Sequence, residues 1–97
     1  MYVRLMMAEC PTEKRMSEFA VLFSEHLEST LWTLPSFRRA DVLFENAGYM
    51  IVVLIVFGSE ADDASYILSP AHAGFVATTK DLLVWPLLTK LFETDEP

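Results

Sequence analysis

Apolar residues recur with a helical period between residues 13 and 33. At 100° per residue they fall within an arc of about 120°, while glutamates and serines fall on the opposite side. The residues in this arc are Met16, Phe19, Ala20, Phe23, Leu27, Thr30, Leu31 and Leu34. The pattern predicts one amphipathic helix, and Pro35 ends it. Val21 and Trp32 lie out of phase and form a second apolar patch, which indicates either a subunit contact or a cover for the turn at Pro35.

The longest apolar run covers residues 49–57, and its β-branched and aromatic side chains show no alternation with polar ones. Such a run is typical of a strand that is buried on both faces. Asn46-Ala47-Gly48 before it predicts a turn, and Gly58 closes it.

Three further segments have the composition of strands: residues 3–7, 37–45 and 84–92. The first stops before Pro11, which disfavours a helix at the residue before it. The last contains Pro86, which predicts a position at the edge of a sheet or at the start of a strand.

A second helical region follows the apolar run and is divided in two. Ser59 is the expected N-cap of a first piece that ends near Leu68, and Ser69 is the expected N-cap of a second piece that ends near Leu83. Pro70 suits the first helical position of the second piece.

The resulting order is β-α-β-β-α-β, with no internal repeat and no linker, so residues 1–97 form a single domain. This order is typical of an α+β, ferredoxin-like fold: a four-stranded antiparallel sheet with two helices on one face. Two helices leave the other face of the sheet uncovered. Because the strand at residues 49–57 is apolar on both sides, we expect that face to pack against a second copy in a dimeric α+β barrel.

Composition supports an oligomer. Of the 97 residues, 53% are hydrophobic and 22% are charged, with a mean hydropathy of +0.31. A domain of this size buries only about 60% of the surface that its unfolded chain exposes. Some of its apolar residues therefore stay at the surface. A membrane-spanning helix needs about 20 apolar residues and the longest run has nine, so we expect a cytoplasmic homodimer with no membrane partner.

Charge and the metal-ligating residue types limit the function classes. A net charge of −7 argues against binding to nucleic acid. Cys10 is the single cysteine, and His26 and His72 are the two histidines, which is too few for a metal site of the usual kinds. We therefore expect no metal. Because the chain has three glycines in all and no Gly-rich phosphate loop, we expect no other cofactor either.

Three motifs resemble the antibiotic biosynthesis monooxygenase-like family of dimeric α/β barrels. Residues 34–38 (Leu-Pro-Ser-Phe-Arg) resemble its turn after the first helix, residues 52–62 its strand exit, and residues 66–72 (Tyr-Ile-Leu-Ser-Pro-Ala-His) its helix break. Ser36 stands where the family usually has glycine, and Phe57 where tryptophan is common.

The resemblance covers almost the whole chain and implies a function. The family contains oxygenases that convert aromatic polyketide phenols to quinones without metal or flavin, in a pocket between sheet and helices. Its haem-degrading branch uses Asn, Trp and His at places that here look like Met7, Tyr66 and Val76, so haem degradation is disfavoured.

Six residues are candidates for the site. His72, on the inward arc of its helix, suits a general base or a polar anchor, and Tyr66 suits a hydrogen-bond donor to a developing oxyanion. A structural histidine and a core-edge tyrosine are the alternatives. These two are the predicted catalytic residues. The predicted substrate-binding residues are Arg4, His26, Phe23 and Phe75.

Two of these candidates have open alternatives. Arg4 shares a strand face with Tyr2 and Met6, where it binds either an anionic substrate or one of the chain's own acidic residues. His26 lies at the edge of the first helix's apolar arc, which favours the boundary with solvent over a position at the pocket. The whole chain also has an alternative function, that of a non-catalytic ligand-binding or structural dimer of the same fold.

Overall fold

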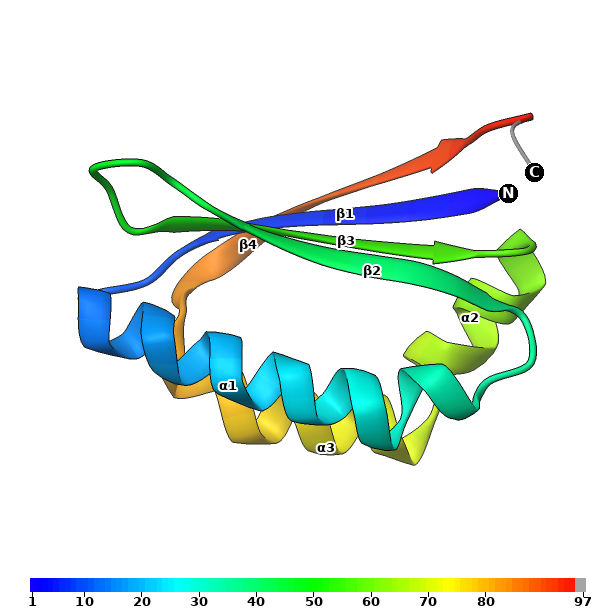
Figure 1. Cartoon of the computed structure of the whole chain (residues 1–97), viewed down its shortest axis with the longest axis horizontal. Coiled ribbons are helices and arrows are strands. Elements are labelled where there is room, and N and C mark those ends of the chain that lie inside the picture. Colours follow the sequence, from blue (N-terminus) through cyan, green and yellow to red (C-terminus); the bar gives the residue numbers. More distant parts are fainter. Residues whose placement is uncertain (96–97) are drawn as a thin grey trace.

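The computed structural model describes residues 1–95. A twisted four-stranded antiparallel sheet forms one layer, and the helices form a second layer against one of its faces (Figure 1). The elements are β1 (Tyr2–Glu9), α1 (Glu13–Ser29), η1 (Leu31–Thr33), β2 (Phe37–Phe44), β3 (Met50–Phe57), α2 (Glu60–Ile67), α3 (Pro70–Thr79), η2 (Lys80–Leu82) and β4 (Val84–Glu93). The expected ferredoxin-like α+β fold is confirmed.

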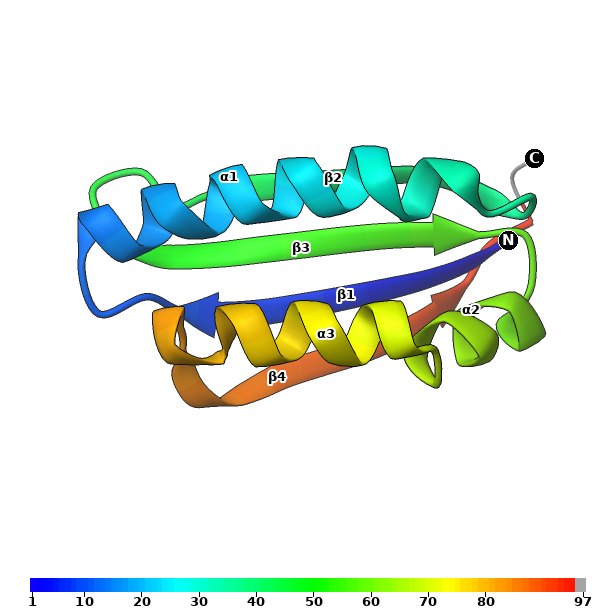
Figure 2. The same cartoon turned by 90° about the horizontal axis from the view of Figure 1, so that it is seen from below.

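The strands are ordered β2-β3-β1-β4, so the two central strands are the apolar β3 and β1. Their register pairs Arg4 with Ile55 and Leu5 with Leu54. β4 lies at the edge, which is the position that Pro86 predicts. In Figure 2, α1 runs along β2 and β3, while α3 runs along β1 and β4.

Side-chain caps start the helices where the sequence predicts them. The hydroxyls of Ser59 and Ser69 accept hydrogen bonds from the backbone N–H three residues later, at 3.3 and 3.2 Å. Pro70 occupies the first turn of α3. Two predicted helix ends are wrong: α1 ends at Ser29 and α3 at Thr79, and a short 3₁₀ turn follows each. Apolar periodicity does not separate a last α-helical turn from a 3₁₀ turn, because both bury the same side chains.

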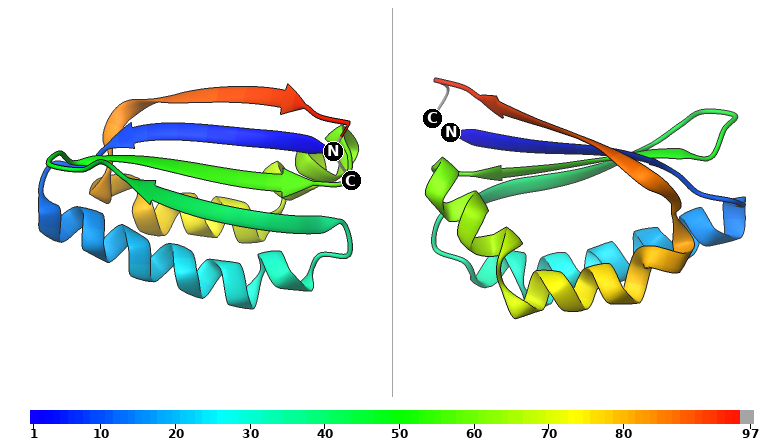
Figure 3. Two further views of the ribbon diagram at one scale, coloured as in Figure 1. Left: turned by 45° about the horizontal axis from the view of Figure 1, so that its top comes forward. Right: turned by 180° about the vertical axis from the view of Figure 1, so that it is seen from behind.

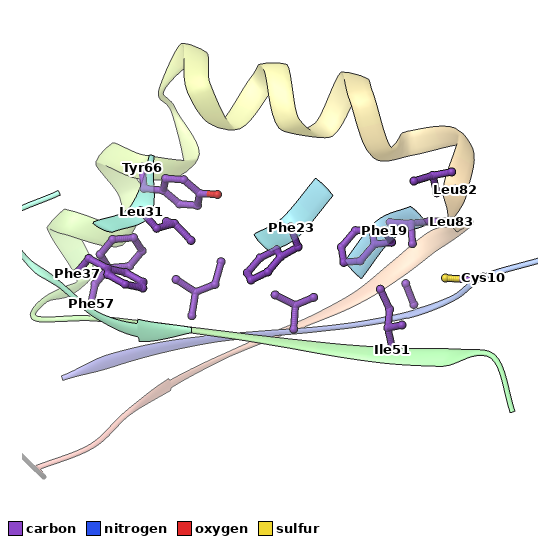
Figure 4. Close-up of a cluster of buried hydrophobic side chains, with 13 residues drawn as sticks. Cys10, Phe19, Phe23, Leu31, Phe37, Ile51, Phe57, Tyr66, Leu82 and Leu83 are labelled. Carbon is purple, nitrogen blue, oxygen red and sulfur yellow. The ribbon is translucent and has the colours of Figure 1, made fainter. Parts of the chain in front are cut away.

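The helix-covered face of β3 carries the core. Ile51, Val53, Ile55 and Phe57 are buried there, against Phe19 and Phe23 of α1 (Figure 4). The alternate residues of β3 point the other way and are only half-buried, except Val56, which is 2% exposed. The predicted two-sided strand is therefore present, with one side filled by the helices.

The other face of the sheet, which we call the open face, is also apolar. Among residues 1–95 no helix packs on it, as Figure 3 shows. The register places the following apolar residues on it: Val3, Leu5, Met7, Leu43, Val52, Leu54, Val56, Leu88 and Phe92. Leu43, Leu88 and Phe92 are at least half exposed.

The second apolar patch that the sequence suggests also lies at the surface. Val21 and Trp32 are both more than half exposed. The Trp32 ring packs edge-on against Phe37, with centroids 4.9 Å apart, so it covers the start of β2 after the Pro35 turn. No helix of the described chain is long and apolar enough to span a bilayer.

Candidate functional site

A cavity of about 80 Å³ lies between the helix-covered face of the sheet and α3. Most of its wall is apolar, and four polar residues interrupt it: Arg4, Tyr66, His72 and Thr79. The apolar lining residues are Met6, Phe19, Phe23, Val53, Ile55, Ile67, Phe75, Val76, Leu83, Trp85 and Leu87. The Thr79 hydroxyl donates to the Phe75 carbonyl within α3.

Arg4 of β1 enters this cavity already paired. Its Nε and Nη2 donate to the two carboxylate oxygens of Asp63, at 2.9 and 2.7 Å. Asp63, in the first turns of α2, is 2% exposed, whereas the Arg4 side chain keeps 22% of its surface. The bidentate bond raises the pKa of Arg4 and fixes the plane of its guanidinium. Of the two partners that the sequence allows for Arg4, the acidic residue is the one present.

Tyr66 of α2 forms a hydrogen bond with His26 of α1. Its Oη lies 2.6 Å from Nε2 of His26, and Figure 4 shows the hydroxyl pointing into the space between α3 and the sheet. Tyr66 is buried, and this burial raises the pKa of its phenol well above the ordinary value, so the hydroxyl stays protonated.

The expectation that His26 lies at the solvent boundary is wrong. His26 is 7% exposed and stacks on Phe75 with ring centroids 4.3 Å apart. It does not line the cavity, and it touches Tyr66, which does. The helical period gives only the angle of a side chain around the axis of α1 and says nothing of neighbouring helices. Here Phe75 of α3 packs on His26 and buries it.

His72 of α3 lines the cavity and has a defined tautomer. Its Nδ1 lies 3.1 Å from the Ile67 carbonyl oxygen, an acceptor, so Nδ1 carries the proton and Nε2 keeps the lone pair in the neutral ring. The ring meets Tyr66 edge-on, with centroids 5.0 Å apart. Burial lowers the pKa of His72, which keeps the ring neutral at pH 7.

The structure thus brings five of the six predicted residues to one cavity: Arg4, Phe23, Tyr66, His72 and Phe75. His26 stands directly behind Tyr66. Sequence reasoning missed Asp63, because Asp62-Asp63 after a serine N-cap is typical of acidic residues that favour a helix N-terminus in solvent.

The arrangement suits a small ligand with an apolar body and an acidic oxygen. Tyr66, His72 and the remaining N–H groups of Arg4 supply hydrogen bonds to the oxygen, and the aromatic and aliphatic residues contact the body. A cavity of about 150 Å³ takes a benzene ring, so this one has to expand before it holds a ring. Within residues 1–95 there is no cluster of His, Cys, Asp and Glu suited to a metal ion.

No protein-family model matches the sequence, and neither does any curated protein sequence. Solved structures do match it, over nearly the whole chain. SnoaB, a cofactor-independent oxygenase from Streptomyces nogalater, superposes with a TM-score of 0.82 at 14% identity, covering 99% of this chain and 94% of its own. A protein described as an antibiotic biosynthesis monooxygenase gives 0.80 at 11% identity, with coverage of 99% and 100%.

This chain has the fold of the antibiotic biosynthesis monooxygenase-like proteins. Rv0793 from Mycobacterium tuberculosis shares it, with a TM-score of 0.79 at 15% identity over 100% of this chain and 98% of that one. The resemblance expected from the sequence motifs is confirmed for the fold. Identities of this size carry no assignment of substrate, so the chemistry has to come from the cavity.

Proposed function

We propose that the chain is a cofactor-independent monooxygenase that oxidises a small aromatic phenol in the cavity beneath α3. The observation that carries the proposal is the cavity itself, an apolar chamber with Arg4, Tyr66 and His72 in its wall. Once the cavity has expanded, an aromatic ring contacts its apolar wall and the ring hydroxyl meets the polar residues. The fold shared with SnoaB supports the same reaction class.

The overall reaction needs only the phenol and O₂. One oxygen atom becomes a new ring carbonyl, and the other leaves as water with the hydroxyl hydrogen and one ring hydrogen, so that phenol plus O₂ gives quinone plus water. The substrate's oxyanion supplies the first electron to O₂. The tasks left to the protein are to remove the hydroxyl proton, to stabilise the oxyanion and to hold the ring in place.

Tyr66 and His72 are the residues that we propose to act on the substrate. The Tyr66 hydroxyl donates to the oxyanion once the hydroxyl proton has left, and Nε2 of His72 accepts from a second hydroxyl where the ligand carries one. Arg4, oriented by Asp63, adds positive charge beside the oxyanion. Phe23 and Phe75 hold the ring, because both rings line the cavity and lie 5.9 Å apart edge-to-face.

Oxygen uptake with monocyclic and bicyclic phenols and hydroquinones tests this proposal. The wild-type chain is expected to consume one O₂ per quinone formed. Tyr66→Phe is expected to lower kcat about 100-fold, the usual size of losing one oxyanion donor. Tyr49→Phe is the matched control, because Tyr49 is half exposed and lies outside the cavity. No uptake with any phenol, or equal loss in both variants, contradicts the proposal.

One observation favours a second function, that of ligand binding without catalysis. Eleven of the fifteen residues that line the cavity are apolar, which suits holding a ring more than chemistry on it. Saturable binding of a phenol with no oxygen uptake supports this alternative. Haem does not suit the site, because Met7 faces the open side of the sheet and the cavity is far too small.

We also propose that the chain forms a homodimer through the open face. The apolar residues of this face lie on all four strands, whereas globular monomers rarely leave so continuous an apolar surface in water. Light scattering at micromolar concentration is expected to give twice the mass of 11.0 kDa. A monomer at that concentration contradicts the assembly but leaves the cavity chemistry untouched.

A further inference from the structure

We propose that His26 is the terminal proton acceptor of this site and acts through Tyr66. The inference builds on the proposed phenol site and adds to it the residue that takes the hydroxyl proton. His26 does not line the cavity, and its hydrogen bond to Tyr66 connects it to a ligand there.

The geometry is that of a two-step proton relay. Nε2 of His26 and Oη of Tyr66 are 2.6 Å apart and both residues are buried. The Tyr66 hydroxyl is a stronger acid than the N–H of a neutral imidazole. In the resting pair, therefore, Tyr66 donates and Nε2 of neutral His26 accepts. The lone pairs of Tyr66 Oη are then left to accept from a ligand hydroxyl in the cavity.

The transfer balances without any further reactant. The ligand O–H proton moves to Oη of Tyr66 while the proton of Tyr66 moves to Nε2 of His26. The ligand becomes an oxyanion, Tyr66 stays neutral and His26 becomes an imidazolium. After the transfer, Nε2–H of His26 donates to Oη and the Tyr66 hydroxyl donates to the oxyanion. One chain of hydrogen bonds therefore serves first as base and then as oxyanion donor.

Two features of the surroundings favour the positive charge on His26. Its ring stacks on Phe75 at 4.3 Å and 20°, and an aromatic face attracts a cation. His26 also lies in the last turn of α1, where the helix dipole stabilises positive charge.

His72 is the competing base, and it lies in the cavity wall beside Arg4, with no hydrogen bond to Tyr66. Burial and then the positive charge of Arg4 lower the pKa of His72, whereas the hydrogen bond to the Ile67 carbonyl and the charge of Asp63 raise it. The titratable and charged groups around the relay are thus Tyr66 and Asp63 of α2, His72 of α3 and Arg4 of β1. Burial and then His72 lower the pKa of His26, so that it is neutral and ready to accept at pH 7. In this arrangement His72 orients the ligand, and His26 takes its proton.

Ionisation of a bound phenol tests the relay without relying on oxygenation. The probe is 4-nitrophenol, whose phenolate absorbs at longer wavelength, added at a pH below its own pKa. Wild-type protein is expected to bind it as phenolate. His26→Gln, which keeps the size and a hydrogen bond to Tyr66 but accepts no proton, is expected to bind it with at least tenfold less phenolate. His72→Gln is expected to weaken binding and to leave the ionised fraction of the bound probe unchanged.

Each outcome decides a different point. Binding with an unchanged phenolate fraction in His26→Gln overturns the relay, and loss of phenolate only in His72→Gln assigns the base to His72. Binding to wild type as the neutral phenol also overturns the relay but leaves the phenol site standing. No binding to wild type overturns the phenol site and the relay together.

A second measurement covers the case in which His26→Gln fails to fold. The ¹⁵N shifts of the imidazoles in the wild-type chain report each tautomer. We expect Nε2 of His26 to be unprotonated at pH 7, and the phenolate fraction to fall as acid protonates His26. A proton on Nε2 at pH 7 contradicts the direction of the hydrogen bond on which the relay depends.

Discussion

The two faces of the sheet are built from the same strands and both carry many apolar side chains, yet the helices of residues 1–95 cover only one face. On the covered face, Ile51, Val53, Ile55 and Phe57 are buried under α1, α2 and α3. On the open face, Leu43, Leu88 and Phe92 keep half or more of their surface. Apolar composition alone therefore does not make a core, because a second layer has to cover it.

The two faces also differ in where their charged residues lie. The covered face holds a buried carboxylate, Asp63, which is paired in two hydrogen bonds with Arg4. The charged residues that the register places on the open face are Arg39, Asp41 and Lys90 in the two edge strands, and Glu9 at the last position of β1. The covered side thus isolates a polar site, whereas the open side has an apolar centre with charge at its edges, as a protein interface does.

The largest expected effect is the loss of a core ring on the covered face. Phe57 is fully buried against Phe37 and Tyr66, so Phe57→Ala is expected to lower the free energy of unfolding by about 4 kcal/mol. Urea unfolding measures it. The matched change on the open face, Leu54→Ala, is expected to cost less and to depend on protein concentration. Equal, concentration-independent losses contradict the difference between the faces.

Breaking the buried ion pair comes second. Asp63→Ala leaves the charge of Arg4 without a partner beneath the helices, and we expect a loss of about 3 kcal/mol in the free energy of unfolding. Asp81→Ala is the control, because Asp81 is exposed at the surface. Thermal and urea unfolding compare the two. A loss for Asp63→Ala that is no larger than that of the control refutes a structural role for the pair.

A charge on the open face tests the proposed interface. Leu54→Asp is expected to weaken the dimer by about 2 kcal/mol, or about thirtyfold in Kd, because the carboxylate is buried unpaired on association. Leu68→Asp is the control, since Leu68 is 85% exposed. Sedimentation measures both variants, and circular dichroism checks that each still folds. A dimer of unchanged strength in Leu54→Asp places the interface elsewhere.

The smallest effect is a dependence of stability on pH that belongs to the covered face. Burial lowers the pKa of His26 and of His72 below the ordinary 6.5, so the unfolded chain binds protons first as the pH falls. Stability is expected to be complete above pH 6.5 and to decrease as the solution is acidified below it. Urea midpoints at several pH values measure the slope, which is expected to be shallower in His26→Gln. An equal slope in that variant removes His26 as a contributor.

Most of the fold was predictable from the sequence because its signals are local. The serine caps, Pro70 and the apolar run of β3 each specify an element, and Pro86 correctly predicts the edge strand. Five of the six site candidates could be assigned to the cavity, because the helical and strand periods determine which side chains lie on the same face of an element.

The rest depends on contacts between elements. Asp63 meets Arg4 across 59 positions of the chain, and His26 meets Tyr66 across 40. Neither pairing has a local signal: Asp63 looks like a residue at a helix start and His26 like one at the edge of a stripe. Only the packing of α2 and α3 against α1 and β1 joins them.

One of the two tryptophans lines the cavity and the other lies outside it. Trp85 lines the cavity and its indole N–H donates to the Lys80 carbonyl, whereas Trp32 packs on Phe37 outside the cavity. A Trp32→Phe chain would therefore carry a single indole, at the ligand's own wall. Its fluorescence would report on occupancy of the cavity directly, so that a library of unlabelled compounds could be screened before any reaction product is known.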